Sequence, residues 1–203
     1  MTTFVGRFFG EGFDFISPAI LPDGTVKSDF RLSDHIAGKM TVVFFYTMDF
    51  SSVCTTELIA LANRARKFAD RGIEVVVVSA DSHLSHQQWR SKSYKGGGIG
   101  NFPFPIVSDV TRNIAKAYEV LVNDSLVLRG TFILDKEGYF RHSSVYDLPM
   151  GRNIDEIIRI IDGLQAYQQT GMLCPAGWQP GDETLKSDPD FMTDYLVAHA
   201  AGL

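Results

Sequence analysis

The feature that most constrains the fold is a pair of apolar runs separated by one amphipathic pattern. The first run is Val42–Tyr46 and the second is Ile73–Ser79. Continuous β-branched and aromatic runs of this length predict strands buried on both faces of a sheet. Between them, apolar residues recur three and four apart from Leu58 to Ala69, the spacing of a helix that packs one face on a sheet. This order predicts a βαβ unit with parallel strands.

The remaining pattern extends this unit into one α/β domain. We expect short edge strands at 13–16 and 29–32, a loop at the glycines of 96–100, and a strand pair joined by a turn at 135–138. Asp109 and Asn153 are predicted to cap helices, and a last short helix is expected over 190–200. The element order predicts a thioredoxin-like domain with insertions over 1–168 and an irregular C-terminal arm over 169–203.

Cys54 falls in the first turn of the helix that follows the first buried strand. Unpaired N–H groups and the positive end of the helix dipole stabilise a thiolate there, and the thiolate is the reactive form of cysteine. Ser51, three residues earlier, is placed to offer a hydroxyl to the same small volume. A free cysteine is also commonly a small buried apolar side chain. Position alone favours neither interpretation.

Charge and hydropathy exclude several classes of protein. The formal net charge of −5 argues against nucleic-acid binding or a basic membrane-surface patch. No apolar segment approaches the roughly 20 residues that span a bilayer. The first residues lack the basic and apolar regions of a secretory signal, so we expect a cytoplasmic protein.

Cysteine and histidine spacing argues against a metal or a cofactor. Cys54 and Cys174 lie far apart, and no C-x-x-C pair is present. His83 and His86 have no third potential ligand nearby, so both are predicted to be surface residues. The glycines of 96–100 lack the spacing of a phosphate-binding loop. We therefore expect neither a metal nor a nucleotide.

Six short motifs follow one another along the chain, at 47–54, 57–58, 78–89, 128–135, 147–152 and 174–178. Together they resemble the typical two-cysteine peroxiredoxins of the alkyl hydroperoxide reductase C and thiol-specific antioxidant class, from about Phe13 to Asp194. Residues 47–54 occupy the active-site signature of that family, Pro-x-x-x-(Thr/Ser)-x-x-Cys, and residues 174–178 its resolving-cysteine motif.

The resemblance implies roles for the matching residues. Cys54 resembles the peroxidatic cysteine, whose thiolate attacks the peroxide O–O bond and becomes a sulfenic acid. Arg129 resembles the guanidinium that stabilises the thiolate and the charge on the peroxide oxygens. Ser51 is expected to hydrogen-bond the peroxide. Cys174 resembles the resolving thiol, which condenses with the sulfenic acid into a disulfide. Without these motifs, Arg129 would be interpreted as a surface charge at the start of a strand. Cys174 would be interpreted as a packed thiol.

The family also implies a function and partners. The expected activity is reduction of hydrogen peroxide and small organic hydroperoxides, in antioxidant defence and peroxide homeostasis. The disulfide is expected to join two subunits of a homodimer, which often assembles into a ring of five dimers. The reductant is thioredoxin or a dedicated flavoprotein disulfide reductase, and the sequence distinguishes neither these nor the preferred hydroperoxide.

The chain departs from the family pattern in two places. Thr47 replaces the signature proline, so we expect the chemistry at Cys54 to be retained but altered. Separately, we expect Glu57 and Arg152 to organise the active-site loop. Residues 97–100 match the family's Gly-Gly-Leu-Gly with Ile for Leu, while its Tyr-Phe pair reads Tyr195-Leu196. This half-kept pattern predicts intermediate to high sensitivity to overoxidation of the cysteine.

Two other functions are compatible with parts of this pattern. A catalytically weakened holdase chaperone or scaffold is one alternative, since Thr47 marks a departure at the active site. Against it, Ser51, Cys54, Arg129 and Cys174 are all present. A thioredoxin-like disulfide reductase needs a second nearby cysteine, and Glu57 occupies that position.

Overall fold

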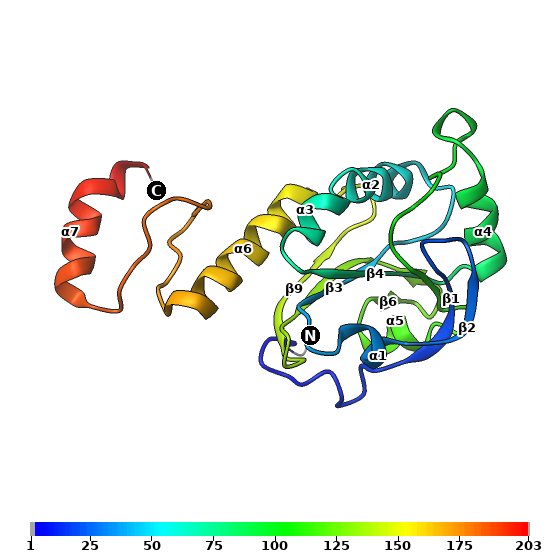
Figure 1. Ribbon diagram of the computed structural model, residues 1–203, viewed down its shortest axis with the longest axis horizontal. Helices are drawn as coiled ribbons and strands as arrows, with labels where there is room; N and C mark the ends of the chain where they lie inside the picture. Colours follow the sequence, from blue (N-terminus) through cyan, green and yellow to red (C-terminus); the bar gives the residue numbers. More distant parts are fainter. Residues whose placement is uncertain (1–2, 203) are drawn as a thin grey trace. The chain divides into compact units, whose positions relative to one another are not determined.

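The computed structural model describes residues 3–202 (Figure 1), and contacts divide the chain after Arg152 into two compact units. The first unit holds a mixed sheet with the strand order β2-β1-β5-β4-β3-β8-β9. The second holds helix α6 (Ile154–Thr170), helix α7 (Pro189–His199) and the short 3₁₀ helix η2 (Ala200–Gly202). The predicted boundary at residue 168 assigned α6 to the first unit.

The strands of the large sheet lie close to the predicted apolar runs. Its central members, β3, β4 and β8, are almost entirely buried, which is why they read as continuous apolar runs. The bounds are β1 Ile16–Ile20, β2 Val26–Arg31, β3 Thr41–Phe45, β4 Glu74–Ser79, β5 Ile106–Ser108, β8 Arg129–Leu134 and β9 Phe140–Tyr146. Strands β6 (Leu121–Val122) and β7 (Leu126–Val127) form a separate small sheet.

The predicted βαβ unit is confirmed. Strand β3 pairs in parallel with β4, and the chain between them is helical. The expected single helix is however two, α2 (Ser52–Ala62) and α3 (Ala65–Ala69). The break is at Asn63 and Arg64, where the Arg64 guanidinium donates to the Ala60 carbonyl at 3.2 Å. That bond satisfies a carbonyl of the kind that a helix end leaves unpaired.

Of the two predicted N-terminal edge strands, the second overlaps β2, which does lie at the edge of the sheet, whereas the first was wrong in position. Strand β1 begins where the first run was expected to end, and it lies between β2 and β5 rather than at an edge. Pro18 is tolerated there because the pairing register with β2 shifts between Ser17 and Ala19. Phe13 instead belongs to the aromatic core.

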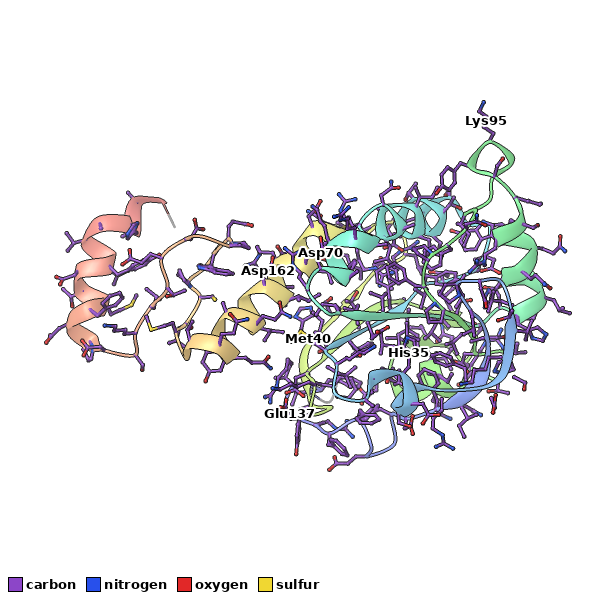
Figure 2. The ribbon with its side chains drawn as sticks, in the orientation of Figure 1. His35, Met40, Asp70, Lys95, Glu137 and Asp162 are labelled. Carbon is purple, nitrogen blue, oxygen red and sulfur yellow. The ribbon has the colours of Figure 1, made fainter. Side chains whose placement is uncertain are left out.

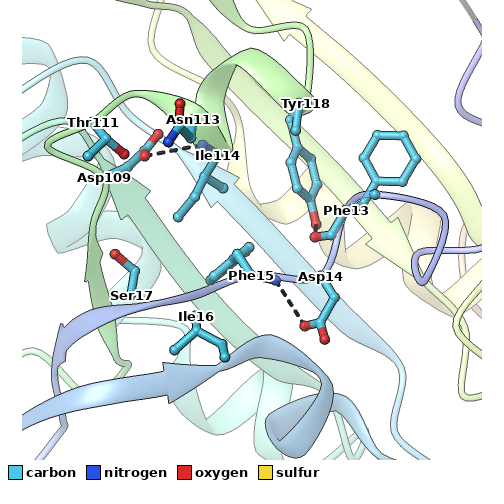
Figure 3. Close-up of a pocket in the computed structure, with 12 residues that line it drawn as sticks. Phe13, Asp14, Phe15, Ile16, Ser17, Asp109, Thr111, Asn113, Ile114 and Tyr118 are labelled. Atoms are coloured by element: carbon cyan, nitrogen blue, oxygen red, sulfur yellow. Dashed lines mark hydrogen bonds between the residues drawn. The ribbon is translucent and has the colours of Figure 1, made fainter.

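Helices cover both faces of the sheet. Figure 1 shows α2 and α3 on one side and α5 (Asn113–Ala117) on the other. Arg112 occupies the N-cap position of α5, but Asp109 does cap the helix with its side chain as predicted. Its carboxylate accepts the N–H of Ile114 at 3.1 Å (Figure 3) and that of Ala115 at 2.7 Å. The remaining helices of this unit are α1 (Leu32–Ile36), α4 (His83–Ser91) and the 3₁₀ helix η1 (Tyr94–Gly96).

The core beneath α5 is aromatic. The rings of Tyr118 and Phe132 lie 5.0 Å apart, edge to face, and both contact Phe4 and Phe140. The buried Tyr118 hydroxyl donates to the Phe13 carbonyl at 3.0 Å (Figure 3). This packing fixes strand β8, and therefore the position of Arg129 at its first residue.

Candidate active site

Cys54 lies at the junction of β3 and α2. It is the third residue of α2, in the first turn as predicted, and its side chain is fully buried. Ser51 is the residue before the helix, and its carbonyl accepts the Thr55 N–H at 2.8 Å. The Ser51 side chain makes no capping bond, so its hydroxyl is not committed to the helix end. Cys54 therefore lies in the turn of α2 where a helix leaves backbone N–H groups without helical partners.

Arg129 brings a guanidinium to this thiol from the neighbouring strand β8. Its Nη1 donates to Cys54 Sγ at 3.2 Å. Its Nε and Nη2 both donate to the Leu148 carbonyl, at 3.0 and 2.7 Å. Because three nitrogens have fixed partners and the side chain is buried, the guanidinium is held in one orientation.

Glu57 lies one helical turn beyond Cys54 and joins two arginines. Its Oε2 accepts a bond from Arg129 Nη1 at 2.8 Å, and its Oε1 accepts bonds from the Arg152 side-chain Nε and backbone N–H, each at 2.8 Å. The expected contact between Arg152 and a carboxylate is therefore present. All three charged side chains are nearly inaccessible to solvent.

Arg152 completes the arrangement. Its Nη1 donates to the Gly130 carbonyl at 2.7 Å, and its guanidinium lies 3.3 Å from the centroid of the Phe44 ring. Burial lowers the pKa of Arg152, and the hydrogen bond and charge of Glu57 oppose that shift. Arg152 thus ties the end of the first unit to strands β3 and β8.

The charges in this cluster balance only when the thiol is ionised. Arg129 and Arg152 carry two positive charges, and Glu57 carries one negative charge. A buried uncompensated charge is costly. The Cys54 thiolate supplies the missing negative charge beside Arg129. The arrangement is therefore suited to hold a nucleophilic thiolate in a dry site.

Thr47 lies in the loop between β3 and α2. Its hydroxyl oxygen is buried, and no hydrogen-bond partner for it exists among residues 3–202. The same loop carries Asp49, which is buried against His86 of α4 with a separation of 2.9 Å between Oδ2 and Nδ1. The Tyr46 hydroxyl donates to Asp49 Oδ1 at 2.6 Å.

The prediction that His86 is a surface residue was wrong, since its side chain is completely buried. His86 is buried because of a tertiary contact. Asp49 and His86 come from different elements, and burial of α4 against the active-site loop brings the pair together. No local pattern in the sequence signals that contact.

Cys174 belongs to the second unit, whereas Cys54 belongs to the first. It is half-buried, and its Sγ lies 3.7 Å from the Gly163 carbonyl of α6. Burial raises the pKa of Cys174, and the charge of Arg159 partly opposes that effect. Both cysteines are free thiols.

Potential metal ligands do not gather in the described part of the chain. Residues 3–202 contain no group of three or more His, Cys, Asp or Glu side chains placed to hold an ion. Within the same residues, no helix is both long and apolar enough to cross a membrane.

The fold and the site define a class: thioredoxin-like α/β proteins with one reactive thiol at a helix N-terminus beside a buried arginine. Comparison of the sequence with protein-family models narrows this class to one family. Residues 15–143 match the AhpC/TSA family, and residues 163–196 match the C-terminal domain of 1-Cys peroxiredoxin.

The relatives span nearly the whole chain. Alkyl hydroperoxide reductase C of Helicobacter pylori is 39% identical over 190 residues, 94% of this chain and 96% of the relative. Peroxiredoxin-1 of Gallus gallus is 43% identical over 184 residues, 90% and 92% of the two chains. The solved reduced 2-Cys peroxiredoxin of Plasmodium vivax superimposes with a TM-score of 0.90 at 35% identity, covering 97% of this chain and 100% of that one. The chain belongs to the AhpC/TSA family of peroxiredoxins.

Proposed function

We propose that this protein is a thiol-dependent peroxidase that reduces hydrogen peroxide and small organic hydroperoxides. The observation that carries the proposal is the 3.2 Å contact between Arg129 Nη1 and the buried Cys54 Sγ. The Cys54 thiolate attacks one peroxide oxygen, the O–O bond breaks, and Cys54 becomes a sulfenic acid. The other oxygen leaves with a proton as water or an alcohol.

The surrounding residues have distinct roles in this step. Arg129 offsets the negative charge that develops on the leaving oxygen, because its donors are already fixed in place. Glu57 and Arg152 position Arg129 and do not meet the peroxide. The Ser51 hydroxyl and the buried Thr47 hydroxyl are the two side-chain hydroxyls of the loop available to hydrogen-bond the substrate.

Cys174 completes the cycle as the resolving thiol. Its sulfur attacks the Cys54 sulfenic acid, water leaves, and a disulfide forms between two subunits. A dithiol reductant, thioredoxin or a flavoprotein disulfide reductase, then exchanges with that disulfide and restores both thiols. The proposal therefore includes a homodimer, and a ring of five dimers as its assembly.

A non-reducing gel tests the pair of cysteines directly. Fully reduced protein is treated with one equivalent of hydrogen peroxide beside Cys54→Ser and Cys174→Ser. We expect a covalent dimer in the unmodified protein and none in either variant. A Cys54 that still titrates as a free thiol, with no dimer, would overturn the proposal.

The holdase or scaffold alternative has no observation in its favour. A protein that had lost the chemistry would not need Arg129, Glu57 and Arg152 in one buried, charge-balanced arrangement around a thiol. Such a cluster is costly to bury and contributes little to stability on its own.

A further inference from the structure

Phe50, directly before Ser51, has a strained backbone. Its φ is +59°, in the left-handed region of backbone conformations that residues other than glycine rarely adopt. Its ring is 47% exposed, so burial in the core does not explain the conformation. Strain of this kind persists where surrounding contacts hold the residue in place.

Two residues at the C-terminal end of α4 supply those contacts. The Lys92 ammonium lies 5.0 Å from the centroid of the Phe50 ring, within the range of a cation–π interaction. The Trp89 ring lies 5.8 Å away from the same ring. Trp89 also donates its indole N–H to the Gly97 carbonyl at 3.1 Å, which links this contact to the glycine loop.

The glycine loop in turn fixes Lys92. The Lys92 carbonyl accepts the Gly100 N–H at 3.1 Å. A Cβ added at Gly98 would lie 2.1 Å from that same carbonyl oxygen, so only glycine allows this close approach. The loop therefore sets where the Lys92 backbone sits, and the Lys92 side chain reaches the active-site loop.

We propose that Lys92 is a positioning residue that holds residues 46–51 in the conformation that buries Cys54. The inference rests on the proposed peroxidase function. A disulfide requires its two sulfurs to approach to about 2.05 Å, and Cys54 Sγ is fully buried. The active-site loop must therefore open before Cys174 reacts. By stabilising Phe50 in its strained conformation, Lys92 slows that opening and leaves the peroxide step untouched.

The test compares Lys92→Met with Lys92→Arg and Lys95→Met. Methionine keeps an unbranched stem and removes the charge, whereas arginine keeps a cation over the ring. Lys95 is the matched control, since it lies on the same loop and points away from the rest of the first unit (Figure 2). Fully reduced full-length proteins are mixed with one equivalent of hydrogen peroxide. Two rates are followed, loss of the Cys54 thiol and formation of the disulfide-linked dimer.

We expect Lys92→Met to form the disulfide about two- to fivefold faster, the effect of one exposed cation–π contact. Thiol oxidation should change less than twofold, and Lys92→Arg should restore the slow rate. Phe50→Leu should accelerate the disulfide similarly, with no further gain when combined with Lys92→Met. Equal disulfide rates in Lys92→Met and Lys95→Met would overturn this inference alone. Absence of any dimer in the unmodified protein would instead overturn the proposed function.

Discussion

The surroundings of the two cysteines differ in almost every physical respect. Cys54 is fully buried near two guanidinium groups, which share the carboxylate of Glu57. Cys174 is half-buried near one carbonyl oxygen, in a unit whose regular structure is mostly α6 and α7. The Cys54 sulfur accepts a hydrogen bond from a buried guanidinium, whereas burial raises the pKa of the Cys174 thiol. The comparison matches the two roles proposed above, in which Cys54 attacks the peroxide and Cys174 reacts only after Cys54 has been oxidised.

The largest expected effect comes from removing the charge that joins the two arginines. Glu57→Gln removes the carboxylate that pairs with both buried guanidinium groups, so we expect the free energy of unfolding to fall by about 3–5 kcal/mol. Chemical denaturation measures this. Glu156→Gln is the matched control in the second unit, where the pair with Arg159 is partly exposed and the expected cost is below about 1 kcal/mol. Equal costs would contradict the contrast between the two regions.

Arg129→Met should have the next largest effect, on rate. It removes the donor beside Cys54, and loss of one preorganised donor to a developing anion costs about 10²–10³ in rate. Stopped-flow measurement of Cys54 oxidation by hydrogen peroxide tests this. Arg66→Met is the control, because that side chain is 93% exposed. Unaltered oxidation in Arg129→Met would remove Arg129 from the proposed site.

Thr47→Val should have a smaller effect on the same rate. It keeps the shape and deletes the buried hydroxyl, so one hydrogen bond to the peroxide is lost and oxidation slows about tenfold. Thr47→Ser should keep the rate close to that of the unmodified protein. Equal rates for Val and Thr at this position would show that the hydroxyl does not meet the substrate.

The smallest effect concerns Cys174. Because burial raises its pKa, a smaller fraction is ionised at neutral pH than in an ordinary thiol. In Cys54→Ser, alkylation by iodoacetamide should therefore be slower than in a short unstructured peptide, and the difference should vanish as the pH rises above the pKa of Cys174. Denaturation in urea should abolish the difference at neutral pH. A Cys174 that reacts at the peptide's rate when folded would contradict the contrast.

Much of the fold followed from local spacing. The runs that became β3 and β4, the capping of α5 by Asp109 and the place of Cys54 in a first helical turn were all predicted correctly. These features depend on residues within a few positions of one another. The break between α2 and α3 and the interior place of β1 were missed, because a side-chain-to-carbonyl bond and a register shift decide them.

The sequence by itself therefore determined the central strands, the place of Cys54 in a first helical turn and, through its motifs, the family. Only the tertiary structure decided how the charges around that thiol are balanced. Glu57 meets Arg129 and Arg152 across separations of 72 and 95 residues, and His86 meets Asp49 across 37. Those contacts exist because β3 pairs with β8 and α4 packs on the active-site loop. Burial and charge pairing are properties of the folded neighbourhood, and local periodicity does not encode them.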